Sequence, residues 1–380
     1  MFEMYILKLI KVFISISMIL SILLLLLFTT LCVNLSLEKQ KKDKRVIEFG
    51  WDMPDTEFVK NNIPKMEKMP FDGLVTQVKY WGDGSDTGDY ISWIGFGSMY
   101  LQYNDEVTKA IKNLQETNFQ KFTDNFIRFN VTPGDVDWFD DWGPILNNIK
   151  IVATIAKEGG LKGIFLDVET YQFPLFSYPD QKYSSSRSFE DYRKQAKLRG
   201  KQLIEAINSI YPNITIFLTY GYTLPYYHTQ NGWSLSASPH GLLPAFLDGI
   251  LGNCDPATRV IDGYEQSYSF KNEEDYIEGY YQIKEDGLTL TDVPDKFESQ
   301  LKAGFGLWID YYWQNYGWDT TNFSNNYFAS AEFESSVRYA LKYSESYVWV
   351  YSQKVNWWTR ENLPEDYIQA LESAKSGSQQ

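Results

Sequence analysis

The sequence predicts an α/β fold, a single (β/α)8 TIM barrel preceded by an N-terminal hydrophobic segment. Short apolar runs typical of buried strands alternate with longer stretches of helical periodicity, and no linker rich in Pro, Gly or Ser interrupts the chain beyond residue 46. Because parallel strands joined by helices make right-handed crossovers, eight such units without a break favour a closed barrel. The alternative is an open doubly wound sheet, but residues 49–54 after the first predicted strand are no Gly-rich phosphate loop.

The hydrophobic segment, residues 12–33, follows Lys8 and Lys11 and is long enough to span a membrane as a helix. We expect residues 1–33 to be a signal peptide or signal anchor and 34–45 a charged linker. The barrel would then be exported, either secreted or attached to the membrane through 12–33. The five basic residues within 38–45 favour the alternative, an anchor with the barrel on the cytoplasmic side. The barrel is expected over 46–370, and 371–380 as a disordered tail.

The predicted elements follow in regular order. The strands are expected at 46–50, 73–79, 125–130, 162–169, 214–220, 259–266, 303–309 and 347–353. The helices between them are expected at 55–68, 104–118, 142–158, 189–210, 241–250, 271–284 and 331–344. The clearest helix is 189–210, because Ser188 precedes it and Asp191 follows three residues later, which is the spacing of a capping box.

Composition narrows the class of ligand. The 380 residues carry a net charge of −14, which disfavours a nucleic-acid partner, and 17% of them are aromatic. With two His and two Cys, Cys32 lying in the hydrophobic segment, neither a His/Cys metal cluster nor a disulfide within the barrel is expected. No cofactor is indicated, and a carboxylate site for calcium or magnesium stays open. A surface rich in Trp and Tyr suits a neutral, ring-shaped ligand.

The alternation of side chains predicts which residues enter the barrel. In 163–169, apolar Ile164, Leu166 and Val168 should face the helices, so that Asp167 and Glu169 face the axis at the C-terminal end of the strand. The same reasoning turns Ile47, Phe49 and Trp51 outward in the first strand. It turns these further residues inward: Glu48, Gly50, Asp52, Gln77, Lys79, Arg128, Asn130, Glu265, Trp308, Asp310, Tyr347, Trp349, Tyr351 and Gln353.

The inward set collects charges at the rim where barrel enzymes place their active sites. Burying charges costs several kcal/mol each unless they are paired, so one interpretation is a purely structural network in which Arg128 and Lys79 neutralise the carboxylates. The other is a carbohydrate site: several carboxylates, no His on a predicted strand, and aromatic loops at the same rim. Cleaving a glycosidic bond requires one carboxylic acid and a second carboxylate.

The run Gly163 to Glu169 resembles the fourth-strand D-x-E ending of barrel glycoside hydrolases such as the chitinase-like family 18 and the endo-N-acetylglucosaminidases. The resemblance implies that Glu169 is the acid and that Asp167 orients a 2-acetamido group of the substrate. It also implies that Tyr264 and Trp349 line the site. Family 18 carries a longer acidic run, and Lys162 and Phe165 replace its earlier acids here, so the resemblance is to barrel glycosidases as a class.

A second pairing joins Glu169 or Asp167 to Glu265. The predicted catalytic residues are therefore Glu169, Asp167 and Glu265. The predicted substrate-binding residues are Asp52, Lys79, Arg128, Asn130, Tyr220, Tyr222, Tyr264, Trp308, Asp310, Trp349, Gln353 and Trp357. The expected function is hydrolysis of an oligo- or polysaccharide. The alternatives are a non-catalytic carbohydrate-binding barrel at the cell surface and, with Lys79 as base, a lyase or isomerase.

Overall fold

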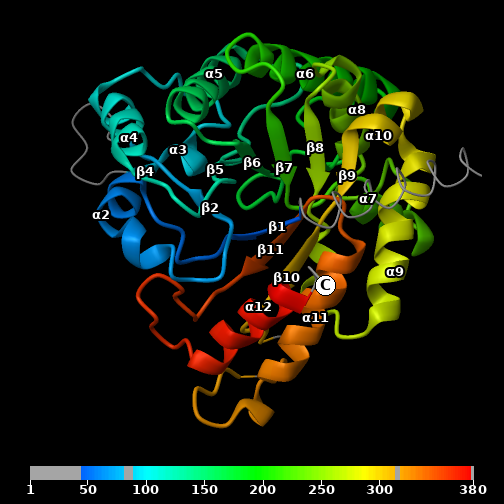
Figure 1. Ribbon diagram of the computed structural model, residues 1–380. Helices are drawn as coiled ribbons and strands as arrows, with labels where there is room; N and C mark the ends of the chain where they lie inside the picture. Colours follow the sequence, from blue (N-terminus) through cyan, green and yellow to red (C-terminus); the bar gives the residue numbers. More distant parts are fainter. Residues whose placement is uncertain (1–43, 81–88, 313–316, 378–380) are drawn as a thin grey trace, which may run out of the picture. The chain divides into compact units, whose positions relative to one another are not determined.

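Parallel strands form a closed ring in the computed structural model, which describes residues 44–80, 89–312 and 317–377 (Figure 1). In sheet order they are β10 (Phe305–Trp308), β11 (Tyr347–Tyr351), β1 (Arg45–Glu48), β2 (Gly73–Thr76), β5 (Phe126–Asn130), β6 (Gly163–Asp167), β7 (Thr215–Leu218), β8 (Arg259–Asp262) and β9 (Leu301–Ala303). The first and last of these are halves of one strand path, divided at Gly304. Since β9 bonds to β8 and β10 bonds to β11, the ring closes and the predicted barrel is confirmed.

Gly304 permits this closure because both neighbouring strands approach its backbone. A Cβ atom there would lie 3.1 Å from the carbonyl oxygens of Asp262 and Tyr347. Such contacts leave little room for any side chain at the point where the strand changes partners.

Each predicted helix is present between the strands. They are α2 (Thr56–Met66), α4 (Asp105–Glu116), α5 (Gly143–Glu158), α6 (Phe189–Asn208), α8 (Leu243–Asn253), α9 (Glu273–Tyr281) and α11 (Ser330–Tyr343). The capping box of α6 forms as expected: the hydroxyl of Ser188 accepts from the N–H of Asp191, whose carboxylate accepts from the N–H of Ser188.

Several further elements were not predicted. They are the ribbon β3 (Lys79–Tyr80) and β4 (Asp89–Tyr90), the helices α3 (Ile91–Ile94), α7 (Thr223–Gln230), α10 (Pro294–Gln300) and α12 (Glu365–Gly377), and the single turns η1 (Glu265–Ser269), η2 (Gln282–Asp286), η3 (Gly287–Leu290) and η5 (Phe323–Asn325). Most of them belong to connections that follow the C-terminal ends of strands.

The predicted tail at 371–380 is wrong for residues 371–377, which complete α12. Leu371 and Ala374 are fully buried, and Lys375 pairs with Asp72 at 2.9 Å. An amphipathic face therefore holds the end of the chain against the barrel. The last three residues lie outside the described part.

The predicted signal peptide or anchor and nearly all of the charged linker also lie outside the described residues. Within the described ranges, no helix combines the length and the apolar character needed to cross a membrane. Export, membrane attachment and orientation remain predictions.

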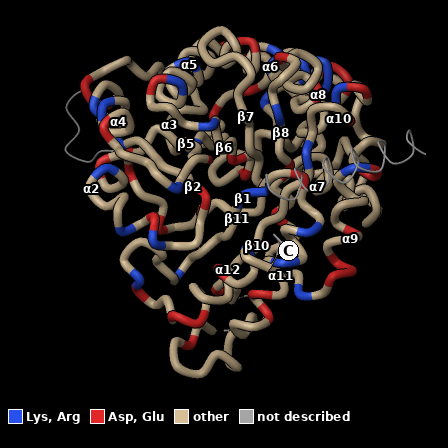
Figure 2. Tube along the Cα trace, in the orientation of Figure 1, with Lys and Arg blue, Asp and Glu red and all other residues tan. Residues whose placement is uncertain are grey.

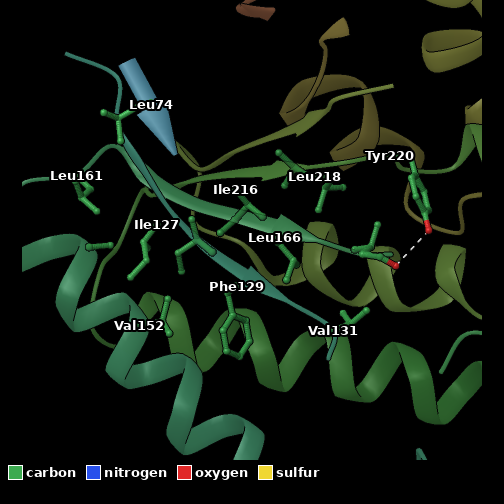
Figure 3. Close-up of a cluster of buried hydrophobic side chains, with 14 of the residues drawn as sticks. Leu74, Ile127, Phe129, Val131, Val152, Leu161, Leu166, Ile216, Leu218 and Tyr220 are labelled. Atoms are coloured by element: carbon green, nitrogen blue, oxygen red, sulfur yellow. Dashed lines mark hydrogen bonds between the residues drawn. The ribbon is translucent and has the colours of Figure 1, made fainter. Parts of the chain in front are cut away.

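Two apolar layers hold the barrel. In the outer layer, Ile127 and Phe129 of β5 and Leu166 of β6 face helices such as α5, which contributes Val152 (Figure 3). The inner layer fills the barrel with ten buried side chains: Ile47, Phe49, Met53, Val75, Phe126, Phe165, Phe217, Ile261, Tyr347 and Trp349. Trp349 fits because Gly263 and Gly306 leave it space, and its Nε1 donates to the carbonyl of Gly263 at 2.8 Å. Because these side chains pack closely, they fill the interior of the barrel below the rim.

The predicted orientation of β1 is wrong by one residue. Ile47 is in register with inward-facing Trp349, and the ring of Phe49 lies 4.3 Å from that of Phe165 inside the barrel. Glu48 therefore faces outward, where it is completely buried. The alternation of side chains predicted the wrong inner face for β1. A buried parallel strand carries apolar side chains on both faces, so a polar residue does not identify the face that points into the barrel.

Lys and Arg residues alternate with Asp and Glu residues along the surrounding helices (Figure 2). Within α6, Lys194 lies 3.8 Å from Glu190, and Lys201 lies 3.7 Å from Glu205. Such exposed pairs contribute little stability each, so the apolar layers carry the fold.

Candidate active site

A pocket of about 570 Å³ opens at the C-terminal ends of the strands. This size lies within the range of about 300–1,000 Å³ typical of ligand sites. Its lining comes from seven barrel strands and the loops that follow them: Phe49, Gly50, Trp51, Met53, Gln77, Tyr90, Trp93, Arg128, Glu169, Tyr171, Glu265, Tyr268, Trp308, Tyr351 and Gln353. We call it the axial pocket, because the packed interior of the barrel forms its base.

Two carboxyl groups face this pocket, Glu169 after β6 and Glu265 after β8. Burial, and next the charge of Asp167, raise the pKa of Glu169 to about 7. Burial, and next the charge of Glu169, raise the pKa of Glu265 well above its ordinary value. Because two neighbouring carboxylates resist double ionisation, the pair retains a proton near neutral pH.

Asp167 lies beneath the pocket rather than in it. Its side chain is fully buried, and Arg128 donates to its Oδ2 at 2.5 Å. Its Oδ1 accepts the N–H of Glu169 at 3.1 Å. The guanidinium of Arg128 is itself held 4.6 Å from the ring centroid of Trp93 and 5.3 Å from that of Phe49. Asp167 thus fixes the backbone that carries Glu169 and neutralises the cation at the base of the pocket.

An unusual backbone conformation directs Glu265 into the pocket. The preceding residue, Tyr264, has φ 42° and ψ 63°, a left-handed conformation that non-glycine residues adopt rarely. The N–H of Glu265 donates to the carbonyl of Thr219 at 3.1 Å. The turn sends the ring of Tyr264 outward, where its hydroxyl donates to Gln282 at 2.6 Å. Strained residues of this kind cluster at functional sites.

Aromatic side chains form two walls of the axial pocket. On one side Trp51 stacks on Trp93, with ring centroids 6.2 Å apart and planes 17° apart, and Trp93 meets Tyr171 edge-on. The hydroxyl of Tyr171 donates to Glu169. On the other side Tyr268 stacks on Tyr351 at 5.2 Å. Flat, partly exposed rings beside carboxyl groups suit the C–H faces and hydroxyls of a sugar.

The structure brings only some of the predicted residues to this pocket: Glu169, Glu265, Arg128, Trp308 and Gln353. Tyr220 lies in a neighbouring pocket that shares both carboxyl groups. Asn130 and Trp349 are completely buried below the rim and line neither pocket.

Other predicted residues hold loops in place. Asp310 accepts the N–H groups of Gln353 and Val355, and Asp52 accepts the N–H of Trp357 at 2.7 Å. Trp357 is fully buried and meets Phe71 edge-on. These carboxylates anchor the connection after β11 instead of facing a ligand.

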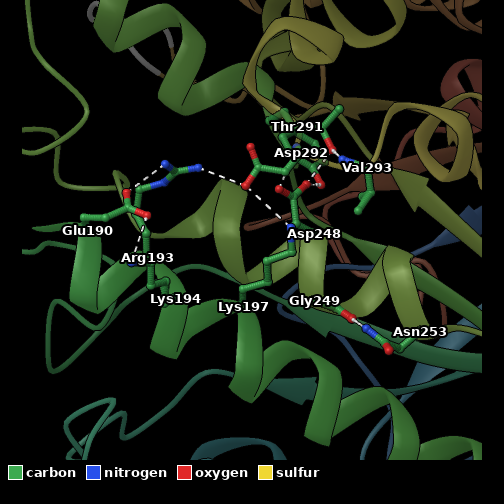
Figure 4. Close-up of polar contacts among 11 residues, drawn as sticks. Glu190, Arg193, Lys194, Lys197, Asp248, Gly249, Asn253, Thr291, Asp292 and Val293 are labelled. Carbon is green, nitrogen blue, oxygen red and sulfur yellow. Dashed lines mark hydrogen bonds and ion pairs between the residues drawn. The ribbon is translucent and has the colours of Figure 1, made fainter.

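Tyr222, Tyr264 and Lys79 lie away from the pocket. The hydroxyl of Tyr222 donates to Asp248 at 2.8 Å, and Asp248 also accepts the N–H of Asp292 (Figure 4). Lys79 is half exposed and pairs with Asp55 in a groove beside α2 and α4. A base at Lys79 would be remote from both carboxyl groups, which leaves the lyase or isomerase alternative without support.

The pocket lining also includes Trp51, Gln77, Tyr90, Trp93, Tyr171 and Tyr268, none of which is among the predicted substrate-binding residues. Gln77 was expected to face inward, whereas the outward direction predicted for Trp51 is wrong. Tyr171 follows Glu169 by two residues and Tyr268 follows Glu265 by three, so proximity in the chain was an available signal. Trp93 carried no such signal, because the β3–β4 ribbon and α3 bring it to the rim.

Among the described residues, no group of three or more His, Cys, Asp or Glu side chains is arranged to hold a metal ion. The residues that line the axial pocket can supply acid–base and nucleophilic chemistry of carboxyl groups, assisted by Arg128 and by tyrosine hydroxyls.

No protein-family model matches the sequence, and no curated protein matches it. Among solved structures, the chain is similar to a GH5-4 broad specificity endoglucanase from Clostridium longisporum, with 11% identity, 84% of this chain and 86% of that chain covered, and a TM-score of 0.48. It is also similar to a protein described as chitinase A from Streptomyces coelicolor, with 8% identity, coverage of 88% and 99%, and a TM-score of 0.41. A third, ZgEngAGH5_4 in complex with a cellotriose, shows 11% identity, coverage of 89% and 97%, and a TM-score of 0.44. At these identities the likeness concerns the barrel fold, which the strand order and register establish by themselves.

Proposed function

We propose that this protein is a glycoside hydrolase that uses Glu169 and Glu265 as its pair of catalytic carboxyl groups. One observation carries the proposal: two carboxyl groups with raised pKa values face a single aromatic pocket at the C-terminal rim of a barrel. A glycosidase needs one protonated and one ionised carboxyl group at the same bond, and a close pair supplies both near neutral pH.

The contacts favour this pair over the pairing of Glu169 with Asp167. Asp167 is enclosed, with Arg128 on one carboxylate oxygen and the N–H of Glu169 on the other. It does not line the pocket, so it has no free face for a 2-acetamido group. Its proposed role is positioning: it orients Glu169 and, by its charge, helps to raise the pKa of that acid.

Either Glu169 or Glu265 can be the protonated acid, and the two possibilities can be distinguished by experiment. The D-x-E resemblance makes Glu169 the acid. The reverse assignment draws on Tyr171, because a hydroxyl that donates to Glu169 favours its ionised form and leaves the proton on Glu265. An acid is dispensable when the leaving group is activated, whereas a nucleophile or base is not.

The test is hydrolysis of oligosaccharides and of aryl glycosides with good leaving groups by the wild type and by Glu169→Gln and Glu265→Gln. The variant that retains activity on activated substrates alone identifies the acid. If the wild type binds sugars but hydrolyses none of them, the protein is the carbohydrate-binding barrel instead. If both variants hydrolyse unactivated sugars at the wild-type rate, the assigned pair is wrong.

A further inference from the structure

A second pocket of about 380 Å³ adjoins the axial pocket. We call it the side pocket. It is lined by Glu169, Thr170, Tyr171, Tyr220, Leu224, His240, Glu265 and Gln266. Glu169, Tyr171 and Glu265 line both pockets, so the two carboxyl groups lie at the junction between them. A ligand that reaches both pockets must pass these groups.

Ring contacts and hydrogen bonds hold the wall of the side pocket in place. Tyr220 and His240 meet edge-on with ring centroids 5.6 Å apart, and the Tyr220 hydroxyl lies 3.2 Å from Nε2 of His240. The same hydroxyl donates to the carbonyl of Val168 at 3.3 Å, next to Glu169 in the chain. The wall is therefore tied to the strand end that presents the carboxyl group.

The described residues that line the side pocket carry no positive charge. Burial, and next the neighbouring His228, lower the pKa of His240 to about 4, so that its ring is neutral at ordinary pH. Within the described part of the chain, no Lys or Arg lines this pocket, while Leu224 adds an apolar surface and Thr170 and Gln266 add polar groups. An anionic ring would meet two carboxyl groups without a cation to pair with. A neutral ring with hydroxyls matches this lining.

We infer that the protein binds a chain of at least two neutral sugar rings. One ring occupies the axial pocket and the next occupies the side pocket, with their linkage at Glu169 and Glu265. The inference rests on the carbohydrate specificity in the proposed function but not on cleavage. It requires that a monosaccharide fills only part of the site.

The test uses Glu169→Gln, in which turnover is suppressed, and measures binding by calorimetry. The probes are glucose, cellobiose and cellotriose, with N-acetylglucosamine and its β-1,4-linked dimer and trimer. We expect the dimer of at least one series to bind at least tenfold more tightly than its monomer. Adding Leu224→Trp fills the side pocket and should abolish this gain, while the monomer affinity changes by less than about twofold. Leu224→Met, which keeps the volume, is the matched control.

A second variant covers the case in which Leu224→Trp does not fold. Gln266→Ala removes a polar group from the side pocket and should weaken dimer binding about 2- to 10-fold, as for one neutral hydrogen bond, without affecting the monomer. Equal affinities for monomer and dimer, or equal losses for both in these variants, would overturn the inference while leaving the proposed function intact. If no sugar of either series binds, the carbohydrate function itself fails.

Discussion

Two pairs of acids with raised pKa values lie on opposite sides of the same sheet. Glu169 and Glu265 face the axial pocket. Glu48 and Asp52 lie on the outer side of β1, where Glu48 is fully buried and Asp52 anchors the loop after β11. Burial raises the pKa of Glu48 well above its ordinary value, with a further rise from Asp52, and burial also raises the pKa of Asp52. By pKa direction alone the two pairs look alike.

Their surroundings separate them. The inner pair borders two pockets and has tyrosine hydroxyls and Arg128 nearby, whereas Glu48 and Asp52 line neither pocket. No ion pair joins either outer acid to a Lys or Arg in the described part of the chain. A raised pKa therefore marks burial, and only access together with stabilising partners converts it into a catalytic property. The following predictions test this distinction.

The largest expected difference is in the rate of hydrolysis. Glu169→Gln or Glu265→Gln should reduce kcat/KM on an unactivated oligosaccharide by about 10²–10⁴-fold, because each removes a proton-transferring or ionised group from the reacting bond. Glu48→Gln is the matched control, because Glu48 is also an acid with a raised pKa, and it should change kcat/KM by less than about twofold. A comparable loss in Glu48→Gln would erase the distinction between the two pairs.

The next effect concerns the ion pair beneath the inner acids. Arg128→Met leaves Asp167 buried without its cation and should lower the free energy of unfolding by about 3–5 kcal/mol, measured by urea denaturation. The control is Lys79→Met. Its ion pair with Asp55 is half exposed and should contribute less than about 1 kcal/mol. Similar losses in both variants would show that the Arg128 pair is not desolvated as the structure indicates.

Glu48 should make stability depend on pH in a defined direction. Its pKa is raised in the folded state above the unfolded value of 4.5, so the folded protein binds the proton more tightly. Stability is then full below that unfolded pKa and falls as the pH rises towards the folded pKa, by up to about 1.4 kcal/mol per pH unit. Glu48→Gln should flatten this decline. Parallel stability curves of the wild type and the variant between pH 4.5 and 8 would contradict it.

The smallest expected effect is a shift in the pH profile of activity. The hydroxyl of Tyr171 lowers the pKa of Glu169, which is about 7, so Tyr171→Phe should raise that pKa. If Glu169 is the acid, the alkaline limb of kcat/KM moves to higher pH; if it is the base, the acidic limb moves instead. Tyr311→Phe, a tyrosine outside the pocket lining, serves as the control. An unchanged profile in Tyr171→Phe would mean that neither limb reports Glu169.

Much of the barrel could be predicted from the sequence. The strands and helices that alternate along the chain lie close to their expected positions, because buried strands require continuous apolar runs and helices require amphipathic ones. The inward directions of Asp167, Glu169 and Arg128 also followed from alternation against apolar neighbours. The helical structure of residues 371–377 was not predicted, because a helix at the end of the chain shows only a few apolar positions.

Only the tertiary structure decided which polar residues become a site. Alternation holds along a strand but ends with its last ladder hydrogen bond, and most rim residues lie beyond that point. Asp52 and Asp310 turn to bind loop N–H groups, and the left-handed conformation of Tyr264 turns its ring outward and Glu265 inward. Which face of β1 points into the barrel was likewise undetermined, because the residues on both of its faces are buried. The sequence by itself thus determined the barrel and the D-x-E strand. The packing of the loops decided which residues line the pocket.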